Sequence, residues 1–299
     1  MTSKQMKTFV AALYGEQAKT PPDQSLKDIR DQYEEFGRMF PIAKGVSTTD
    51  TIAGGVPAQW LTAGNARQDS VLLYLHGGGY VSGSISTHIG MTSRLSGAAK
   101  AKVLALDYRL APEHPFPAAV EDAVAAYRWL RDEGYDTSRL AVAGDSAGGG
   151  LTVALLLALR REGLPQPACA IPISPWVDLD GSGAWRQADP ACDPICDAAA
   201  LSDFAADYVK GGDLHNPLAS PILGDLTGLP PLLIQVGSLE ILLSDATRLA
   251  DRATAAGVDT TLEIEDGAPH VWHHAVPLLP EAMAAIDRIG TFVQQHTDD

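Results

Sequence analysis

The sequence G-D-S-A-G at residues 144–148 joins a short apolar run to a stretch of helical character. The run at residues 140–143 predicts a buried strand, and residues 147–161 predict a helix. A serine held at such a turn is exposed, and backbone N–H groups at the helix N-terminus favour developing negative charge there. The pattern alone arises easily by chance, so its place between strand and helix is what makes Ser146 a candidate nucleophile.

Similar apolar runs alternate with helical stretches on both sides of this motif. Strands are predicted at residues 71–75, 103–106, 140–143, 170–173, 232–236 and 260–264, and helices at 86–99, 118–132, 147–161, 244–256 and 280–295. Two weaker strands, at residues 48–53 and 57–62, would form an antiparallel edge. The alternation predicts an α/β fold, with a mostly parallel central sheet flanked by helices on both faces.

Two segments interrupt this alternation. Residues 1–45 have helical periodicity before any strand, and residues 176–220 combine an Asp/Pro-rich loop with a helix. Ligands bind at the carboxyl ends of the strands in open α/β sheets, so helices set over that edge would form a lid. We therefore expect a catalytic domain over residues 46–175 and 221–299, with a helical cap built from the two interrupting segments.

The sequence H-G-G-G-Y at residues 76–80 directly follows the first predicted buried strand. Successive glycines let backbone N–H groups point into a cleft, as an oxyanion hole requires. The alternative is a phosphate-binding loop, but no G-K-[ST] follows. We interpret the motif as an oxyanion loop.

A nucleophilic serine needs a base, and the base should lie on the loop after the last strand. His270, His273 and His274 all follow that strand. His270 is nearest to the strand and is our predicted base; His273 is the alternative. No H-E-x-x-H pattern accompanies the cluster, so we expect no metal.

The base in turn needs a carboxylate, which should follow the strand at residues 232–236. Glu240 comes directly after that strand, whereas Asp245 already lies at the start of the next helix. A carboxylate in a first helical turn is also a common stabiliser of the helix. We predict Glu240 as the acid, with Asp245 and then Asp266 as alternatives.

The loop D-Y-R-L-A-P-E-H-P-F-P at residues 107–117 is dense in proline and charge. Asp107, Arg109 and Glu113 are predicted to form a structural network of ion pairs that braces the turn at the serine, because a carboxylate removed from water needs a partner. A catalytic role for these residues is the alternative.

Composition limits the partners. The net charge of −15 argues against nucleic acid and anionic membranes, because phosphate binding needs a basic surface. No apolar run reaches the roughly 18 residues that span a bilayer, and the first residues resemble no signal peptide, so a cytoplasmic protein is expected. Cys192 and Cys196 lie in the repeat D-P-A-C-D-P-I-C-D at residues 189–197; we interpret them as reduced thiols rather than as a metal site or redox pair.

Taken together, these motifs resemble the hormone-sensitive-lipase-like (bacterial family IV) esterases of the α/β-hydrolase superfamily. The resemblance rests on the motifs at residues 76–80, 107–119 and 144–149, with S-P-W-V-D-L at 174–179 and P-H-V-W-H at 269–273. It extends from about residue 50 to the end of the chain, and the N-terminal helices fit the family's cap.

The resemblance implies a carboxylesterase that hydrolyses esters through an acyl-enzyme on Ser146, with His270 as base, Glu240 as acid and no cofactor. The N–H groups of Gly78, Gly79 and Ala147 would form the oxyanion hole. Many members carry Asp-Pro-Leu-x-Asp at the acid, whereas this chain has Glu-Ile-Leu-Leu-Ser-Asp at residues 240–245.

The resemblance also implies short to medium acyl chains and small-molecule esters as partners. Lactone hydrolysis on the same triad is the alternative activity, and a non-catalytic small-molecule binder on the same fold is a more distant one. A homodimer through the last strand and its helix is a further implication. The expected pocket walls, for which packing within the lid is the alternative role, are Tyr80, Phe36, Phe40, Phe204 and Tyr208.

Overall fold

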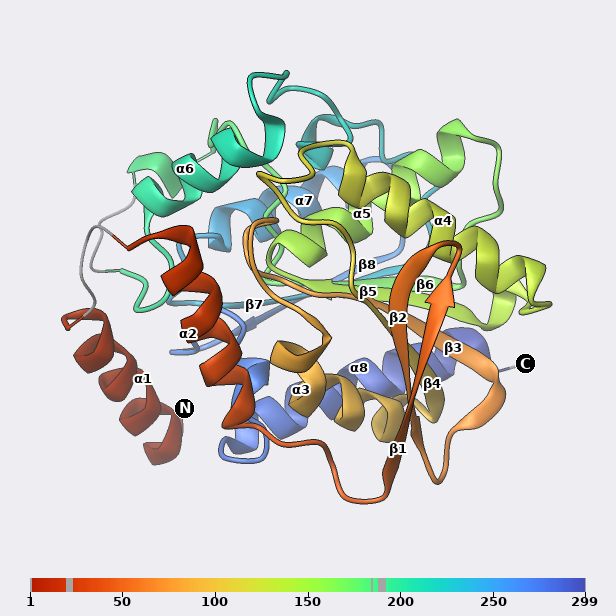
Figure 1. Cartoon of the computed structure of the whole chain (residues 1–299), viewed down its shortest axis with the longest axis horizontal. Coiled ribbons are helices and arrows are strands. Elements are labelled where there is room, and N and C mark those ends of the chain that lie inside the picture. Colours follow the sequence, from red (N-terminus) through yellow and green to blue (C-terminus); the bar gives the residue numbers. More distant parts are fainter. Residues whose placement is uncertain (1, 20–23, 184, 188–191, 299) are drawn as a thin grey trace.

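The computed structural model describes residues 2–19, 24–183, 185–187 and 192–298. Its centre is one eight-stranded sheet in the order β1-β2-β4-β3-β5-β6-β7-β8 (Figure 1). β2 is antiparallel to β1 and β4, and the remaining neighbours are parallel. The strands are β1 (Val46–Ala53), β2 (Val56–Ala63), β3 (Arg67–Leu75), β4 (Ala101–Leu106), β5 (Leu140–Asp145), β6 (Cys169–Ile173), β7 (Leu232–Gly237) and β8 (Thr260–Glu265). The predicted sheet and its antiparallel edge are confirmed.

Helices cover both faces of the sheet, α3 and α8 on one and α4, α5 and α7 on the other (Figure 1). The α-helices are α1 (Lys4–Gln17), α2 (Leu26–Arg38), α3 (Ile85–Ala99), α4 (Ala118–Asp132), α5 (Ala147–Arg161), α6 (Ala198–Val209), α7 (Leu243–Ala255) and α8 (Pro280–Thr297). Short 3-10 helices lie at Thr137–Arg139, Trp185–Gln187, Pro221–Leu223 and Trp272–Ala275.

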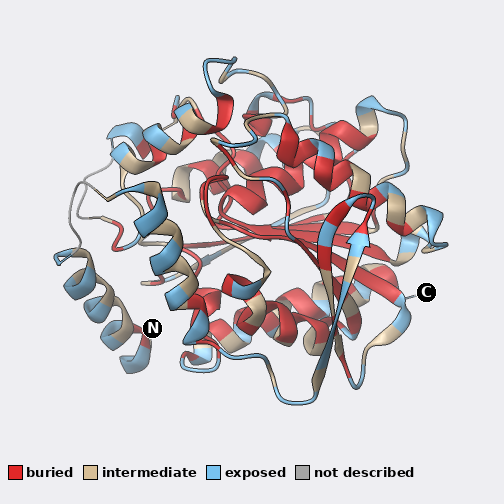
Figure 2. Ribbon diagram, in the orientation of Figure 1, coloured by how far each residue is buried: buried red, intermediate tan, exposed pale blue. Residues whose placement is uncertain are grey.

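The strand sequences explain why two layers of helices are needed. β5, β6 and β7 are buried along their whole length, as the central strands of Figure 2 show. Successive side chains of a strand point to opposite faces, so Leu72 packs in the core beneath α3 and α8 while Leu73 packs in the core beneath α4 and α5. An apolar strand in the middle of a parallel sheet must therefore be covered twice.

Helices α1, α2 and α6 lie together at one end of the molecule (Figure 1). They fall within the two segments predicted as a cap, and the division into cap and catalytic domain stays a prediction. α2 begins with a capping box, in which Ser25 and Asp28 each accept the other's backbone N–H. Residues 189–191 of the Asp/Pro-rich repeat lie outside the described residues. None of the described helices is long and apolar enough to cross a membrane.

Candidate active site

Ser146 forms the turn between β5 and α5. Its φ of 54° and ψ of −120° lie in a region that L-residues rarely adopt, and strain of this kind persists where the surroundings enforce it. The backbones of β3 and α5 meet very closely here, since a Cβ on Gly148 would lie 2.0 Å from the Leu75 carbonyl oxygen. The strand-to-helix turn predicted from the G-x-S-x-G pattern is therefore present, with Ser146 8% exposed.

Glu240 and His270 are hydrogen-bonded to each other. The imidazole Nδ1 lies 2.8 Å from Glu240 Oε2. The other carboxylate oxygen, Oε1, accepts hydrogen bonds from the Ser174 hydroxyl and the Gly237 N–H, each at 2.6 Å. Both oxygens of this buried carboxylate are thus partnered, which fixes its orientation toward the imidazole.

Adjacent strands bring these side chains to one edge of the sheet. Ser146 follows β5, Ser174 follows β6 and Glu240 follows β7, while His270 lies on the loop after β8. The Ser146 N–H donates to the Ile173 carbonyl at 2.9 Å, and the Val271 N–H donates to Ser174 Oγ at 3.3 Å. Ser174 therefore links the segment next to the serine with the acid and with the histidine loop.

The electrostatics of this group follow from burial and close charges. Burial opposes protonation of His270, but the Glu240 carboxylate and a hydrogen bond to the Cys196 sulfur outweigh it and raise the pKa of the imidazole above its ordinary value. Burial also raises the pKa of the Glu240 carboxyl, against the hydrogen bonds from its partners. Cys196 shares a hydrogen bond with His270, and burial raises the pKa of this thiol, which keeps it protonated at neutral pH.

The alternative residues have other contacts. Asp245 Oδ2 accepts the N–H groups of Val177 and Asp178 at 3.0 Å, so it holds the loop after β6. His273 is fully buried, with Nε2 2.8 Å from Gln235 Oε1 on β7. Asp266 accepts a hydrogen bond from the Thr2 hydroxyl. In this structure only Glu240, of the three acid candidates, is hydrogen-bonded to His270.

The glycine loop between β3 and α3 has the shape that the oxyanion interpretation needs. Gly78 has φ +116°, and a Cβ there would lie 2.3 Å from the Ser82 carbonyl oxygen, so only glycine fits. The Gly77 N–H is already engaged, donating to Asp145 Oδ1 at 3.1 Å. Ala147 is the first residue of α5, where an N–H has no partner within the helix.

The charged loop after β4 braces the glycine loop and a neighbouring helix. The ring of Tyr108 stacks on His76 at 4.3 Å, and its hydroxyl donates to the His76 carbonyl at 2.7 Å. Arg109 pairs with Asp122 on α4, and Glu113 pairs with Arg30 on α2. The ion pairs found in this loop thus involve Arg109 and Glu113 and join it to α4 and α2, and no ion pair of Asp107 is found among the described residues. A bracing of the turn at Ser146 by this network stays a prediction.

The predicted pocket aromatics fall into two groups. Tyr80 stacks on Tyr208 of α6 with ring centroids 3.8 Å apart, and a Cβ on Gly79 would lie 2.5 Å from the ring of Phe204. These three residues thus lie against the oxyanion loop. Phe36 and Phe40 instead pack on each other at 5.1 Å, in the core beside α3.

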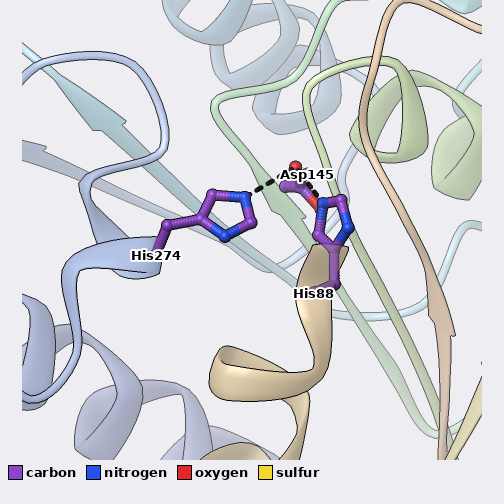
Figure 3. Close-up of side chains that lie close together, drawn as sticks. All are labelled: His88, Asp145 and His274. Atoms are coloured by element: carbon purple, nitrogen blue, oxygen red, sulfur yellow. Dashed lines mark hydrogen bonds and ion pairs between the residues drawn. The ribbon is translucent and has the colours of Figure 1, made fainter. Parts of the chain in front are cut away.

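A buried polar cluster that the motifs did not predict lies directly beneath the serine turn (Figure 3). His88 from α3, Asp145 from the end of β5 and His274 from the last 3-10 helix meet with ligand-type atoms within 4.8 Å of one another. These donors are of the kind that bind metals. However, the hydroxyl of Tyr33 lies 3.2 Å from His88 Nε2 and 3.4 Å from His274 Nε2, so it links the two rings. We interpret the cluster as a hydrogen-bond network.

Sequence reasoning also missed two residues that contact the proposed triad. Ser174 opens the S-P-W-V-D-L motif, and its position after a buried strand was the signal that could have marked it. Cys196 contacts His270 from the segment just before α6, far along the chain from the end of β6, so no sequence pattern placed it there.

Comparison with known proteins finds relatives over nearly the whole chain. Residues 72–274 match the family model described as the alpha/beta hydrolase fold. An acetyl-hydrolase of Streptomyces hygroscopicus is 49% identical over 268 residues, covering 89% of this chain and 87% of that protein. A crystal structure of an esterase from the bacterial hormone-sensitive lipase family has a TM-score of 0.95 and 49% identity, covering 99% of each chain. Esterase EstE5, in a crystal soaked with p-nitrophenyl butyrate, has a TM-score of 0.95 and 43% identity over 99% of this chain and all of that one.

Proposed function

This chain belongs to the hormone-sensitive-lipase-like family of α/β-hydrolase esterases and is a carboxylic ester hydrolase, and we propose that it cleaves short to medium acyl esters through an acyl-enzyme on Ser146. The observation that carries the proposal is the hydrogen-bonded pair of His270 and Glu240 at the sheet edge where the strained Ser146 lies. Nucleophile, base and orienting acid are the three parts that serine hydrolysis needs.

In the first step Ser146 Oγ bonds to the ester carbonyl carbon, and its proton passes to Nε2 of His270. Glu240 holds the imidazole by Nδ1 and stabilises the imidazolium that forms. The carbonyl oxygen, now negative, is bound by the N–H groups of Gly78, Gly79 and Ala147. Loss of one such donor costs about 3–4 kcal/mol in related sites.

The tetrahedral intermediate then collapses. The bond to the alcohol oxygen breaks, and His270 gives its proton to that oxygen, so the alcohol leaves and the acyl group stays on Ser146. A water molecule repeats the sequence: His270 takes its proton, the new oxygen bonds to the acyl carbon, and Ser146 regains a proton as the acid departs.

The preference for shorter acyl chains rests on the helix over the oxyanion loop. Phe204 of α6 lies against Gly79, and Tyr208 of the same helix stacks on Tyr80. Large aromatic rings so close to the proposed oxyanion donors limit the room for a long chain. The acetyl-hydrolase relative and the neighbour soaked with p-nitrophenyl butyrate agree with short acyl groups.

Replacement of the nucleophile tests the proposal. Ser146→Ala should fold as the wild type does, lose hydrolysis of p-nitrophenyl acetate and butyrate, and no longer be labelled by a fluorophosphonate probe. Ser47→Ala, on the exposed strand β1, is the matched control and should keep both ester hydrolysis and labelling by the probe. Turnover near the wild-type rate in Ser146→Ala would refute the assignment.

The acyl preference has its own test. Turnover of p-nitrophenyl esters from C2 to C12 should be highest among the shorter chains, and a maximum above C10 would contradict the proposal. Lactones in the same panel test the alternative activity.

We also propose a homodimer through β8, which lies at the end of the sheet with Ile264 49% exposed. An edge strand carries unpaired backbone groups that a second copy can pair with. Ile264→Lys should then convert a dimer to a monomer in sedimentation velocity. A wild type that sediments as a monomer at micromolar concentration would exclude this arrangement.

A further inference from the structure

Helix α2 presents three polar side chains on one face, at positions 30, 33 and 34, and all three contact the chain just after the glycine loop. Arg30 Nε donates to the Val81 carbonyl at 2.7 Å. Glu34 accepts a hydrogen bond of 2.6 Å from Ser84, the N-cap of α3. Tyr33 contacts His88 within α3 at 3.2 Å. The spacing i, i+3, i+4 is that of one helix face, so α2 docks as a unit on this segment.

The contact through Tyr33 continues inward to the glycine loop itself. His88 Nε2 lies 3.1 Å from Asp145 Oδ1 (Figure 3). The Gly77 N–H donates to the same carboxylate oxygen at 3.1 Å, and its nitrogen lies 3.3 Å from His88 Nε2. Asp145 also accepts a hydrogen bond of 2.6 Å from the Tyr74 hydroxyl at the end of β3. The carboxylate next to Ser146 thus holds the residue that precedes the proposed oxyanion donors.

Asp145 is ionised in this buried position. Burial opposes the charge, but His88, His274 and the Tyr74 hydroxyl outweigh it and hold the pKa of the carboxyl well below its usual range. A buried charge stays only where its hydrogen bonds are complete, so each partner contributes to one fixed arrangement.

Tyr33 connects this arrangement to the histidine loop as well. Its hydroxyl lies 3.4 Å from Nε2 of His274, four residues beyond His270. One hydroxyl of α2 therefore touches both the network under the glycine loop and the short helix that follows the proposed base.

We propose that α2 holds the oxyanion loop in its reacting conformation, with Tyr33 and Arg30 as positioning residues for ester hydrolysis. The inference rests on the proposed oxyanion hole. Its donors must lie about 2.7–3.1 Å from the developing oxyanion, and small displacements of such groups are costly because they act mainly in the transition state. Loosening α2 should therefore lower kcat and leave KM nearly unchanged.

Tyr33→Phe is the main test, because it removes only the hydroxyl and keeps the ring packed on Phe36 and His274. We expect kcat for p-nitrophenyl butyrate to fall about tenfold with KM within about twofold of the wild type. Arg30→Met, which loses the hydrogen bonds to the Val81 and Ala111 carbonyls and the ion pair with Glu113, should act in the same direction. The matched control is Tyr127→Phe, which loses a buried hydroxyl bonded to the Pro165 carbonyl on the opposite side of the sheet and should keep the wild-type kcat.

An inhibitor separates positioning from general loosening. A trifluoromethyl ketone forms a tetrahedral oxyanion on the serine, so its Ki should rise in Tyr33→Phe by the same factor by which kcat/KM falls. The inference would be overturned if Tyr33→Phe had the same kcat and Ki as Tyr127→Phe. It would also be overturned if Tyr33→Phe raised KM and left kcat unchanged. If the proposed function itself were wrong, Ser146→Ala would stay active, a result that is independent of α2.

Discussion

The acid of the proposed triad has each of its oxygens assigned to different partners. Glu240 Oε1 takes two donors, the Ser174 hydroxyl and the Gly237 N–H, and Oε2 faces Nδ1 of His270. The position can therefore accept hydrogen bonds from three sides but has no place for a donor. Because this position accepts hydrogen bonds and donates none, the effect of replacing the carboxylate with an amide can be predicted.

Glu240→Gln should lower kcat/KM by about 10²–10⁴-fold. The two donors keep the amide oxygen, so the amide NH₂ must face Nδ1 and select the tautomer with its proton on Nε2, where the base needs a lone pair. Loss of the negative charge also lowers the pKa of His270, because the carboxylate helps to raise it. The acid limb of the kcat/KM profile against pH should move to lower pH. Glu265→Gln, which changes a carboxylate paired with Arg288, is the control; equal rates in both variants would contradict the role of Glu240.

Cys196→Ala tests the unexpected contact of a thiol with His270. Because the thiol is protonated at neutral pH, its sulfur raises the pKa of the imidazole only by accepting a hydrogen bond from the protonated ring. Alanine at this position should shift the acid limb of the pH profile downward, in the same direction as Glu240→Gln but without the large fall in kcat. Cys192→Ala, in the same loop, should leave the limb in place. An upward shift in Cys196→Ala would show that the thiol acts mainly through burial of the ring.

At the scale of single residues, the sequence predicts those that directly follow the end of a strand. Ser146, Glu240 and His270 each follow a predicted strand, and parallel strands end at one edge of the sheet. Ser174 and Cys196 are set by contacts between segments far apart in the chain, so local spacing contains no sign of them. The network of Tyr33, His88 and Asp145 is hidden for the same reason.

At the scale of elements, α6 sets the proposed acyl limit. Phe204→Ala removes the ring that lies against Gly79 and should shift the maximum of the p-nitrophenyl ester series to longer chains, with turnover of the acetate changed least. Phe292→Ala on α8, where the ring packs at a tilt against His296, is a control that should not move the maximum. An unchanged maximum in Phe204→Ala would place the acyl chain elsewhere.

Helix α7 is tied to the loop after β6 by a buried charge. Asp178 is fully buried and accepts hydrogen bonds from Arg248, Ser182 and two backbone N–H groups, and these outweigh burial and lower its pKa. Arg248→Met should reduce the free energy of unfolding by about 1–2 kcal/mol, less than for a fully buried pair because the guanidinium is partly exposed.

Urea unfolding across pH checks the origin of that loss. A carboxyl with a lowered folded pKa contributes stability above its unfolded pKa, and this contribution disappears as pH falls through the folded value. The difference in the free energy of unfolding between Arg248→Met and the wild type should therefore be largest at pH 7 and should decrease below about pH 4. Arg128→Met, which breaks an ion pair with Glu162 on the surface, should lower the free energy of unfolding by about 0.5 kcal/mol or less. If this difference in unfolding free energy did not depend on pH, Arg248→Met would act only through the loss of side-chain packing.

Strand and helix types were predictable because the hydrophobic pattern separates them, as in the short, mostly apolar runs of β5, β6 and β7. The beginning of β3 at Arg67 was not, because the polar residues 67–70 carry no period-2 pattern. The break between α1 and α2 also lay hidden inside one helical segment, where the capping pair Ser25 and Asp28 was the available signal.

At the scale of the whole molecule, the net charge of −15 should act on substrates before they reach the site. We compare p-nitrophenyl butyrate with the mono-p-nitrophenyl ester of succinic acid, which has a similar chain ending in a carboxylate. A negative protein lowers the local concentration of an anion, so kcat/KM for the succinate should be about tenfold lower at 0.01 M salt.

Salt separates this long-range effect from the pocket. The Debye length falls from about 30 Å at 0.01 M to about 3 Å at 1 M, so repulsion by the distributed surface charge should nearly vanish at high salt. The cost of burying a carboxylate in the proposed acyl pocket of Tyr80, Phe204 and Tyr208 should remain. The ratio of kcat/KM for the butyrate to kcat/KM for the succinate should therefore decrease as salt is added but stay above one. A ratio that salt does not change would assign the whole preference to the pocket walls, and a ratio near one at low salt would show that the net charge has no influence on substrate choice.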